Sequence, residues 1–225
     1  EFEKDLIHRL IKTDYFDEIK STQQYARENL GLVEDNFWHA IRAGFQTDGI
    51  GRNKVSKWYA EKNKSILVTY MIPYVSTYMQ TQQASLVAAL SVVQTFQEYG
   101  CYAGIKWRND VMVGGKTAGI FSESLDHPKG NVFLIGIGIN INQEEKDLLS
   151  IGQPANSLKA ATSAEEEFDL NEVYDVVSRH LYFNLNIMNT FGFDRLKPEI
   201  EAQLTHIGER ISVKERGSDE ILTGK

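Results

Sequence analysis

Runs of β-branched, aliphatic and aromatic residues mark the expected strands of this chain. Such runs favour extended structure. They occur at residues 37–45, 65–72 and 131–142. The segments 104–113 and 116–122 flank the pair Gly114-Gly115. Because glycine adopts the backbone angles that a tight turn requires, this arrangement predicts a β-hairpin.

Two longer segments carry apolar residues at helical spacing. The first predicts an amphipathic helix over residues 82–99 that ends at Gly100 and covers a sheet. The second begins at Asp169, which with Glu172 resembles a capping box. Its apolar positions form one stripe that we expect to face the core. The stripe consists of Val173, Val177, Leu181, Leu185 and Met188.

The order of these elements predicts the α+β class, with a mixed, largely antiparallel sheet and helices packed on one face. After Gly208 the residues alternate again, which predicts a last hairpin at 209–225. Two strands alone are only marginally stable. We therefore expect a main domain at 1–208 and interpret 209–225 as the beginning of an incomplete, small β-domain.

The composition is that of an ordinary globular protein, with 42% hydrophobic and 24% charged residues. Its net charge of −7 disfavours general binding to nucleic acids, whose phosphates would be repelled. No apolar stretch approaches the ~18 residues of a membrane span. The single cysteine, Cys101, cannot form an internal disulfide, and no basic-then-apolar segment near the first residue resembles a secretion signal. We expect a soluble, cytoplasmic protein in which Cys101 is buried.

Residues 46–58 form a polar segment with chemistry suited to an anion. Gly49 and Gly51 let backbone N–H groups approach a phosphate closely, and Arg52 offers a planar fork of donors. The segment matches neither the Walker pattern nor the dinucleotide fingerprint. An anion-binding loop and an ordinary surface loop with turn glycines both remain open on this pattern.

Two other segments combine charged or small residues with apolar neighbours. If 104–113 is a regular strand, Lys106, Arg108 and Asp110 share one face. That row is either an exposed, salt-bridged face or the edge of a buried site. Residues 135–142 alternate aliphatic side chains with glycine and asparagine. One face of this strand is therefore nearly bare, which suits a flat ligand or tight packing against a helix.

Taken in order, these segments resemble the catalytic core of the biotin protein ligases. The family pattern contains S-T-N, then Q-x-x-G-R-G-R followed by W, then K-W-P-N-D, K-x-A-G-I-L-x-E and G-I-G-I-N-x-N. The matching segments here are 21–23, 46–58, 106–110, 116–123 and 135–142, with Asn156-Ser157-Leu158 further along. The resemblance runs from about residue 10 to about residue 215.

The resemblance implies the class II synthetase-like core of biotin and lipoate ligases for 1–208, and it implies that 209–225 begins an SH3-like β-domain. Three positions depart from the family pattern. Gln23 replaces Asn, Ile50 replaces the first Arg of the glycine loop, and Arg108 replaces Pro. Gln23 keeps the amide group, whereas Ile50 removes one cation from the expected phosphate site.

The activity implied by the resemblance has two steps. Biotin and ATP give biotinyl-5′-adenylate and pyrophosphate, and the biotinyl group then passes to one lysine of a carrier protein. The biotin carboxylate attacks the α-phosphorus directly, so no protein nucleophile is needed. The protein must supply positioning and electrostatic stabilisation.

The resemblance also implies the residues of the site. It gives catalytic roles to Lys116, Arg52 and Asp110, of which Lys116 lies between biotin and the α-phosphate. The residues implied for biotin binding are Ser21, Thr22, Gln23, Gln46, Gly49, Ile50, Gly51, Arg52, Lys116 and Gly119. Those implied for ATP and the adenylate are Arg52, Trp58, Lys106, Asn109 and Asn140.

The implied ligands and partners follow from the two steps. Mg²⁺ accompanies ATP and is held by phosphate oxygens and water, with Glu123 as a candidate protein ligand and no fixed metal site. The implied acceptor is the biotin carboxyl carrier protein of acetyl-CoA carboxylase or of a related carboxylase. The first motif begins at Ser21. We therefore expect a short form without the N-terminal DNA-binding domain of some relatives, with no DNA or membrane partner, and a homodimer is a candidate assembly.

Two alternatives remain on the sequence. Lipoate ligases and octanoyl transferases share the core, but their R-R-x-S-G-G-G-x-V-x-H loop and catalytic Cys with R-G-G do not occur here. A degenerate, non-catalytic biotin-binding module is suggested by Gln23 and Ile50. Arg52 and Lys116 argue against that module.

Overall fold

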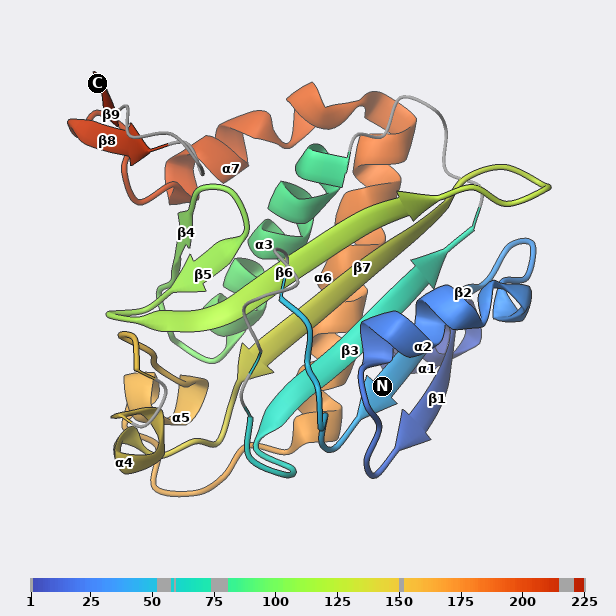
Figure 1. Ribbon diagram of the computed structural model, residues 1–225, viewed down its shortest axis with the longest axis horizontal. Coiled ribbons are helices and arrows are strands. Elements are labelled where there is room, and N and C mark those ends of the chain that lie inside the picture. Colours follow the sequence, from blue (N-terminus) through green and yellow to red (C-terminus); the bar gives the residue numbers. More distant parts are fainter. Residues whose placement is uncertain are drawn as a thin grey trace.

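The computed structural model describes residues 2–51, 58, 60–73, 81–149, 152–214 and 221–224 and is built on a seven-stranded sheet (Figure 1). The strands are β1 (Ile11–Phe16), β2 (Trp38–Ala43), β3 (Ser65–Ile72), β4 (Gly104–Lys106), β5 (Asp110–Met112), β6 (Lys116–Leu125), β7 (Val132–Asn140), β8 (Ile211–Lys214) and β9 (Ile221–Gly224). The helices are α1 (Phe2–Leu10), α2 (Thr22–Glu28), α3 (Thr81–Glu98), α4 (Glu145–Leu148), α5 (Leu158–Thr162), α6 (Leu170–Phe191) and α7 (Lys197–Gln203). The short 3₁₀ helices are η1 (Leu30–Leu32) and η3 (Phe193–Arg195).

The large sheet has the strand order β1-β2-β3-β7-β6-β5-β4. Its first pair, β1 and β2, is parallel, and each of the other neighbouring pairs is antiparallel. This confirms the predicted α+β class with a mixed, largely antiparallel sheet. At its centre, β7 lies between β3 and β6, so β3 and the consecutive pair β6–β7, which are distant in sequence, form one continuous surface.

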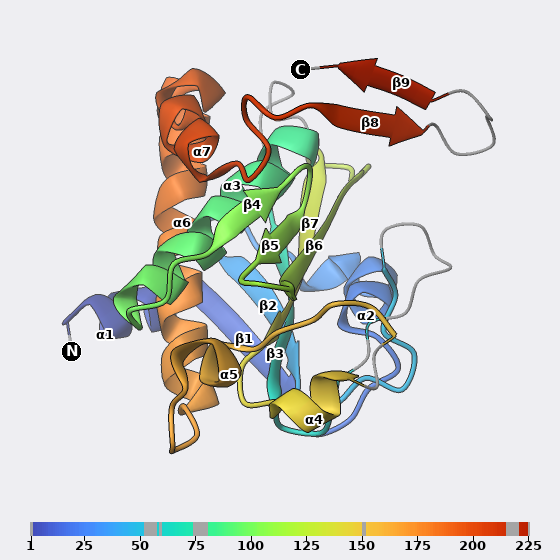
Figure 2. The same ribbon diagram turned by 90° about the vertical axis from the view of Figure 1, so that its left-hand side faces the viewer.

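Helices cover the two faces of the sheet unequally (Figure 2). The long helices α3 and α6 lie on one face, as predicted, and pack against each other. The short helix α2 lies on the opposite face, over β2, β3 and β7. None of the helices that the structure describes is long and apolar enough to cross a membrane. The two long helices therefore leave the second face of the sheet accessible for a ligand.

Local signals set the limits of both long helices. α3 spans Thr81–Glu98, close to the predicted 82–99, and the following Gly100 has a φ of 70°, which glycine adopts without strain. The side chain of Asp169 caps α6 by accepting a hydrogen bond of 2.7 Å from the backbone N–H of Asn171. All five residues of the predicted α6 stripe are buried.

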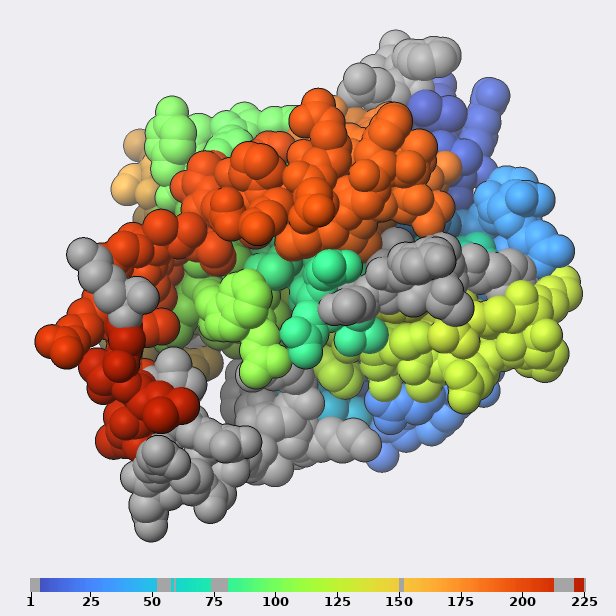
Figure 3. Space-filling view, turned by 90° about the horizontal axis from the view of Figure 1, so that it is seen from above, coloured from blue at the N-terminus to red at the C-terminus, as the bar shows by residue number. Residues whose placement is uncertain are grey.

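The core lies between the sheet and these helices. Tyr70 on β3 is fully buried, and its hydroxyl forms a 2.8 Å hydrogen bond with Ser178 of α6, which ties the helix to the central sheet. Figure 3 shows α6 and α7 in orange as a continuous band across this side of the molecule. Cys101 is buried as predicted, and burial raises the pKa of its thiol. Its role is that of a small apolar core residue.

Substituting Leu181 tests the contribution of the α6 stripe. Leu181 is fully buried in the main core. We expect Leu181→Ala to lower the free energy of unfolding by about 2–5 kcal/mol, because it removes buried methyl groups and leaves a cavity. Phe191, which is 71% exposed at the end of the same helix, provides the control. Urea unfolding of both alanine variants measures the difference, and equal losses would contradict a buried role for the stripe.

The predicted hairpin at 104–122 is only partly correct. Gly114 does form the turn before β6, with a φ of 64°. However, 104–113 is not one strand, because the chain reverses at residues 107–109 and β4 pairs with β5. Lys106 and Asp110 are therefore cross-strand neighbours, and the prediction that Lys106, Arg108 and Asp110 share one strand face is wrong.

The alternation after Gly208 does produce a hairpin. β8 and β9 form a separate antiparallel pair, with Ile211 opposite Gly224. The predicted turn at Gly217-Ser218 lies outside the described residues. The assignment of 209–225 to an SH3-like domain stays a prediction.

Candidate active site

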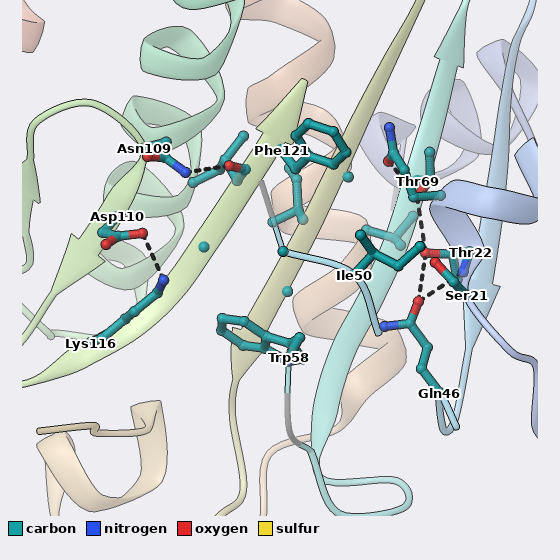
Figure 4. A pocket seen from close by; sticks show the side chains of 18 of the residues that line it. Ser21, Thr22, Gln46, Ile50, Trp58, Thr69, Asn109, Asp110, Lys116 and Phe121 are labelled. Atoms are coloured by element: carbon teal, nitrogen blue, oxygen red, sulfur yellow. Dashed lines mark hydrogen bonds and ion pairs between the residues drawn. The ribbon is translucent and has the colours of Figure 1, made fainter. Parts of the chain in front are cut away.

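A cavity of about 290 Å³ lies on the sheet face that carries α2. Its floor is formed by the middle strands β3, β7 and β6, and its walls come from the start of α2, from the segment that follows β2, and from the β4–β5 turn. This volume is at the lower end of the range for small-molecule pockets. Figure 4 shows polar residues gathered at two sides of the cavity.

One side, which we call the buried end, consists of Ser21, Thr22, Gln23 and Thr69. All four are at least 95% buried. Ser21 caps α2 by accepting a hydrogen bond from the backbone N–H of Gln24. This cap fixes the helix start, which brings Thr22 and Gln23 to the cavity. Such densely buried polar groups require hydrogen-bond partners.

Gln46 supplies a hydrogen-bond donor at the buried end. Its Oε1 accepts from the backbone N–H of Thr22 at 2.8 Å and from the Thr22 hydroxyl at 3.1 Å. The carbonyl oxygen is thereby engaged, so the amide group that remains is the Nε2 donor. Figure 4 shows this nitrogen directed toward the cavity, away from Thr22.

Gln23 has the opposite polarity. Its Nε2 donates to Glu123 at 2.8 Å, and its Oε1 accepts from the Thr69 hydroxyl at 3.1 Å. A Cβ placed on Gly136 would lie 2.5 Å from this Oε1, so the carbonyl lies directly on the bare floor of β7. The buried end therefore combines an amide donor on Gln46 with a carbonyl acceptor on Gln23. A cyclic urea, which has both N–H donors and a C=O acceptor, matches this pair.

The glycines of β7 serve as predicted, by leaving the floor bare. Ile135, Ile137 and Ile139 face the core, while Gly136 and Gly138 face the cavity. The Trp58 ring lies against Gly138, where a Cβ would come within 2.7 Å of it. Glycine is thus required for the aromatic ring to lie flat on the sheet.

Trp58 is also held from its own segment. Its backbone N–H donates to the Gly49 carbonyl at 3.0 Å, and a Cβ on Gly49 would lie 2.9 Å from the Trp58 carbonyl oxygen. The indole Nε1 is buried and has no hydrogen-bond partner among the described residues. A buried donor of this kind is expected to have an acceptor, so the cavity suits a ligand with an acceptor next to the indole.

The other side of the cavity, which we call the lysine end, contains Lys116 and Asp110. Lys116 Nζ lies 2.8 Å from Asp110 Oδ1, and the two side chains are 25% and 28% exposed. The ammonium group is also 5.7 Å from the centre of the Trp58 ring. Gly119 leaves room for it, because a Cβ there would be 3.3 Å from Nζ. A cation is thus held beside an aromatic surface, where it can neutralise a ligand anion.

Backbone hydrogen bonds hold the strand that carries Lys116. The Lys116 N–H donates to the Pro154 carbonyl at 2.9 Å, and the Asn156 N–H donates to the Lys116 carbonyl at 3.0 Å. The Asn156 side chain donates to Val113 O at 2.7 Å, on the other arm of the turn. Gly115 permits this approach, since its Cβ would meet the Ala155 backbone at 2.8 Å. The Asn156-Ser157-Leu158 motif therefore has a positioning role.

The structure brings most of the predicted site residues together. Those that line the cavity are Ser21, Thr22, Gln23, Gln46, Ile50, Gly51, Trp58, Asn109, Asp110, Lys116 and Gly119. Gly49 supports Trp58 from behind, without lining the cavity. Arg52 lies outside the described residues.

Three predicted residues lie elsewhere. Lys106 is exposed on the edge strand β4, away from the cavity lining. Asn140 is buried and donates to the Asn156 carbonyl at 3.1 Å, so it supports the Lys116 turn rather than lining the cavity. The Glu123 carboxylate accepts a hydrogen bond from Gln23, and both of its oxygens accept from Arg27. The candidate Mg²⁺ ligand is therefore occupied with protein donors.

Several site residues were missed in the sequence. Thr69, Phe121 and Gln153 line the cavity, and Arg27 anchors Glu123. Thr69 lies inside a strongly apolar strand. The hydroxyl group at this position was the only sign in the sequence that the residue belongs to a site. Arg27 precedes Glu123 by 96 residues, so only the placement of α2 over the sheet reveals the pair.

Comparison with known proteins shows the family of this chain. The profile of the Biotin/lipoate A/B protein ligase family matches residues 15–142, which is more than half of the chain and includes both ends of the cavity. The chain belongs to this family. The matched residues include the buried end, the glycine floor and Lys116.

Individual relatives of the biotin/lipoate ligase family share parts of the chain. The bifunctional ligase/repressor BirA of Bacillus subtilis is 31% identical over 137 residues, 59% of this chain. That match spans only 41% of the relative's length. The biotin protein ligase of Aquifex aeolicus, solved in complex with biotin and ATP, superposes with a TM-score of 0.78 at 26% identity, over 95% of this chain and 86% of that one. The Leishmania major biotin protein ligase with biotinyl-5-AMP, at 14% identity and a TM-score of 0.69, shows the same fold.

Proposed function

We propose that this protein is an ATP-dependent biotin protein ligase. The observation that carries the proposal is the cavity itself, which has a fixed donor and acceptor at the buried end and a lysine at the other. Gln46 and Gln23 match the ureido group of biotin, and Lys116 is then placed to meet its carboxylate. The Aquifex aeolicus structure with biotin and ATP supports the choice of both substrates.

In the first step, the biotin carboxylate oxygen bonds to the α-phosphorus of ATP and pyrophosphate leaves. Two anions must approach each other, and the Lys116 ammonium reduces their repulsion. It also stabilises the negative charge that develops on the phosphorus oxygens. Gly119 leaves room for the Lys116 ammonium, and Gly138 lets the Trp58 ring lie flat on the sheet beside it. Arg52 is proposed as a second cation at the phosphate, on the family resemblance alone.

The nucleotide is proposed to lie against Trp58, at the lysine end. Its ring provides a flat stacking surface, and the buried Nε1 offers a hydrogen bond. Asn109 is held on β6 by its side chain, which donates to Ile120 O at 2.6 Å, and so forms a rigid wall of the cavity.

Mg²⁺ is proposed to enter with the triphosphate. Within the described part of the chain, no group of three or more His, Cys, Asp or Glu side chains is arranged to hold a metal ion. Phosphate oxygens and water are sufficient ligands for Mg²⁺ with a nucleotide. Glu123 is not proposed as a ligand, because Arg27 and Gln23 already contact its carboxylate.

In the second step, the amine of a carrier-protein lysine attacks the acyl carbon, and AMP leaves. Asp110 is proposed to orient this amine and to accept its proton while paired with Lys116. The proposed acceptor is the biotin carboxyl carrier protein of acetyl-CoA carboxylase or of a related carboxylase. Because this chemistry consumes ATP, a cytoplasmic location is proposed with it.

Pyrophosphate release distinguishes the candidate functions. The protein is incubated with Mg·ATP and either biotin, lipoate or no acid. We expect release that depends on biotin and not on lipoate, because lipoate lacks the ureido group that Gln23 and Gln46 bind. Release with lipoate alone would assign the chain to the sister branch of the family. Biotin binding with no release would instead show a binding module without turnover.

A further inference from the structure

The Gln23 amide spans three adjacent strands. It contacts Thr69 on β3, lies over Gly136 on β7 and donates to Glu123 on β6. Thr69 and Gly136 are paired in register, and Phe121 of β6 is the next partner of Gly136. The amide therefore crosses the floor of the buried end, where rotation by half a turn would exchange its acceptor for a donor.

Glu123 determines which way this amide is turned. An ionised carboxylate has acceptor oxygens and no donor. The end of Gln23 that meets Glu123 must therefore be its NH₂ group, and the carbonyl must lie on the side of Thr69 and Gly136. A neutral partner at 123 with both donor and acceptor atoms would not impose this orientation.

Arg27 in turn holds the Glu123 carboxylate in position. Its Nη2 contacts Oε1 at 2.9 Å and Oε2 at 2.7 Å, and the two side chains are 34% and 19% exposed. Arg27 stands in the last turn of α2, on the same helix as Gln23. One helix thus supplies both the amide and the cation that fixes its partner.

We propose that Arg27 is a positioning residue for substrate recognition, acting through Glu123 to hold the Gln23 carbonyl toward the cavity. The group recognised is an N–H donor of a cyclic urea. This inference rests on the proposed function, since it names how that site selects its acid. Without Arg27, Glu123 loses the contact that holds its carboxylate beside Gln23. Gln23 can then turn and present its NH₂ group beside the Gln46 donor, and the buried end no longer matches a ligand with both donors and an acceptor.

The test compares Arg27→Met with wild type in biotin-dependent pyrophosphate release. We expect the KM for biotin to rise about tenfold, as for the loss of one charge-assisted hydrogen bond. We expect kcat to stay within about twofold and the KM for ATP to be unchanged, since the lysine end is untouched. Arg27→Lys keeps a cation, so its KM for biotin should lie much closer to that of wild type.

Arg179→Met is the matched control. Arg179 makes the same two-oxygen contact with Glu98, at 2.7 and 2.8 Å, between α6 and α3 on the far face of the sheet. It removes an equivalent ion pair without touching the site, so the KM for biotin should not change. A rise in the biotin KM as large as that of Arg27→Met would overturn the proposal.

A double variant tests whether Arg27 acts through Glu123. If it does, Arg27→Met and Glu123→Gln share one effect, and the double variant should show the same increase of about tenfold as the worse single variant. If the two increases in the biotin KM instead multiply to about 100-fold, Arg27 and Glu123 act independently, and the proposal that Arg27 acts through Glu123 is overturned. If Arg27→Met does not fold, Glu123→Gln and Arg27→Lys are compared in its place. The first should raise the KM for biotin, and the second should leave it close to the wild-type value.

Direct binding of biotin in the absence of ATP separates two kinds of failure. If wild type neither binds biotin nor releases pyrophosphate with it, the proposed function is wrong. If wild type is active and Arg27→Met has an unchanged biotin KM, only the positioning role is wrong. A fall in kcat together with a rise in the KM for ATP would show general damage to the site and would also overturn the positioning role.

Discussion

Lys116→Ala is expected to lower the rate of biotinyl-adenylate formation on the order of 10²–10³-fold, mostly through kcat. Lys116 is the cation held at the lysine end, 2.8 Å from Asp110 and beside the Trp58 ring. Its positive charge stabilises the transition state most strongly, because negative charge accumulates on the phosphorus oxygens when the carboxylate reaches the α-phosphorus. Its removal also leaves the Asp110 carboxylate unpaired next to two anions.

Single-turnover measurement with biotin and Mg·ATP gives the rate of this step directly. Lys116→Arg keeps the charge but not the compact ammonium, so it should recover only part of the rate. Lys197→Ala is the control, because Lys197 makes an exposed pair with Glu201 on α7. A Lys116→Ala rate within a few-fold of wild type would remove Lys116 from the catalytic step.

Gly138→Ala is expected to reduce kcat/KM for ATP on the order of 10²-fold, with a smaller effect on biotin binding. The added Cβ would lie 2.7 Å from the Trp58 ring, which is closer than real Cβ contacts permit. The ring must then move off the sheet, and displacement by about 1 Å at a positioning group can cost this much activity. β7 lies at the centre of the sheet and has little freedom to shift instead.

Gly136→Ala is the variant to compare with Gly138→Ala, because Gly136 lies two residues away on the same face of β7. Its Cβ would lie 2.5 Å from Gln23 Oε1, at the buried end. We therefore expect Gly136→Ala to act mainly on the KM for biotin and Gly138→Ala mainly on that for ATP. Steady-state titration of each substrate measures both. Equal effects on both substrates from both variants would contradict the assignment of the two ends.

The helices and strands were largely predictable because their signals are local. The run at 65–72 is β3 with the same limits, and the apolar spacing before Gly100 places α3 within one residue at each end. In contrast, the reversal at 107–109 has no glycine or proline to mark it. Asn109 is held there by β6, since its carbonyl accepts from the Ile120 N–H at 3.0 Å. A contact from another strand therefore outweighed the local preference for a continuous strand.

By itself, the sequence determined the central strands, the two long helices with their buried stripes and the residue types of the site, because periodicity, capping and motif spacing are properties of neighbouring residues. Only the tertiary structure decided which of those residues meet. The pairing of β3, β7 and β6 places Thr69 beside Gly136, and the packing of α2 brings Arg27 to Glu123 across 96 positions. Such contacts depend on register and on helix placement, and both are set by burial of the whole core rather than by any local pattern.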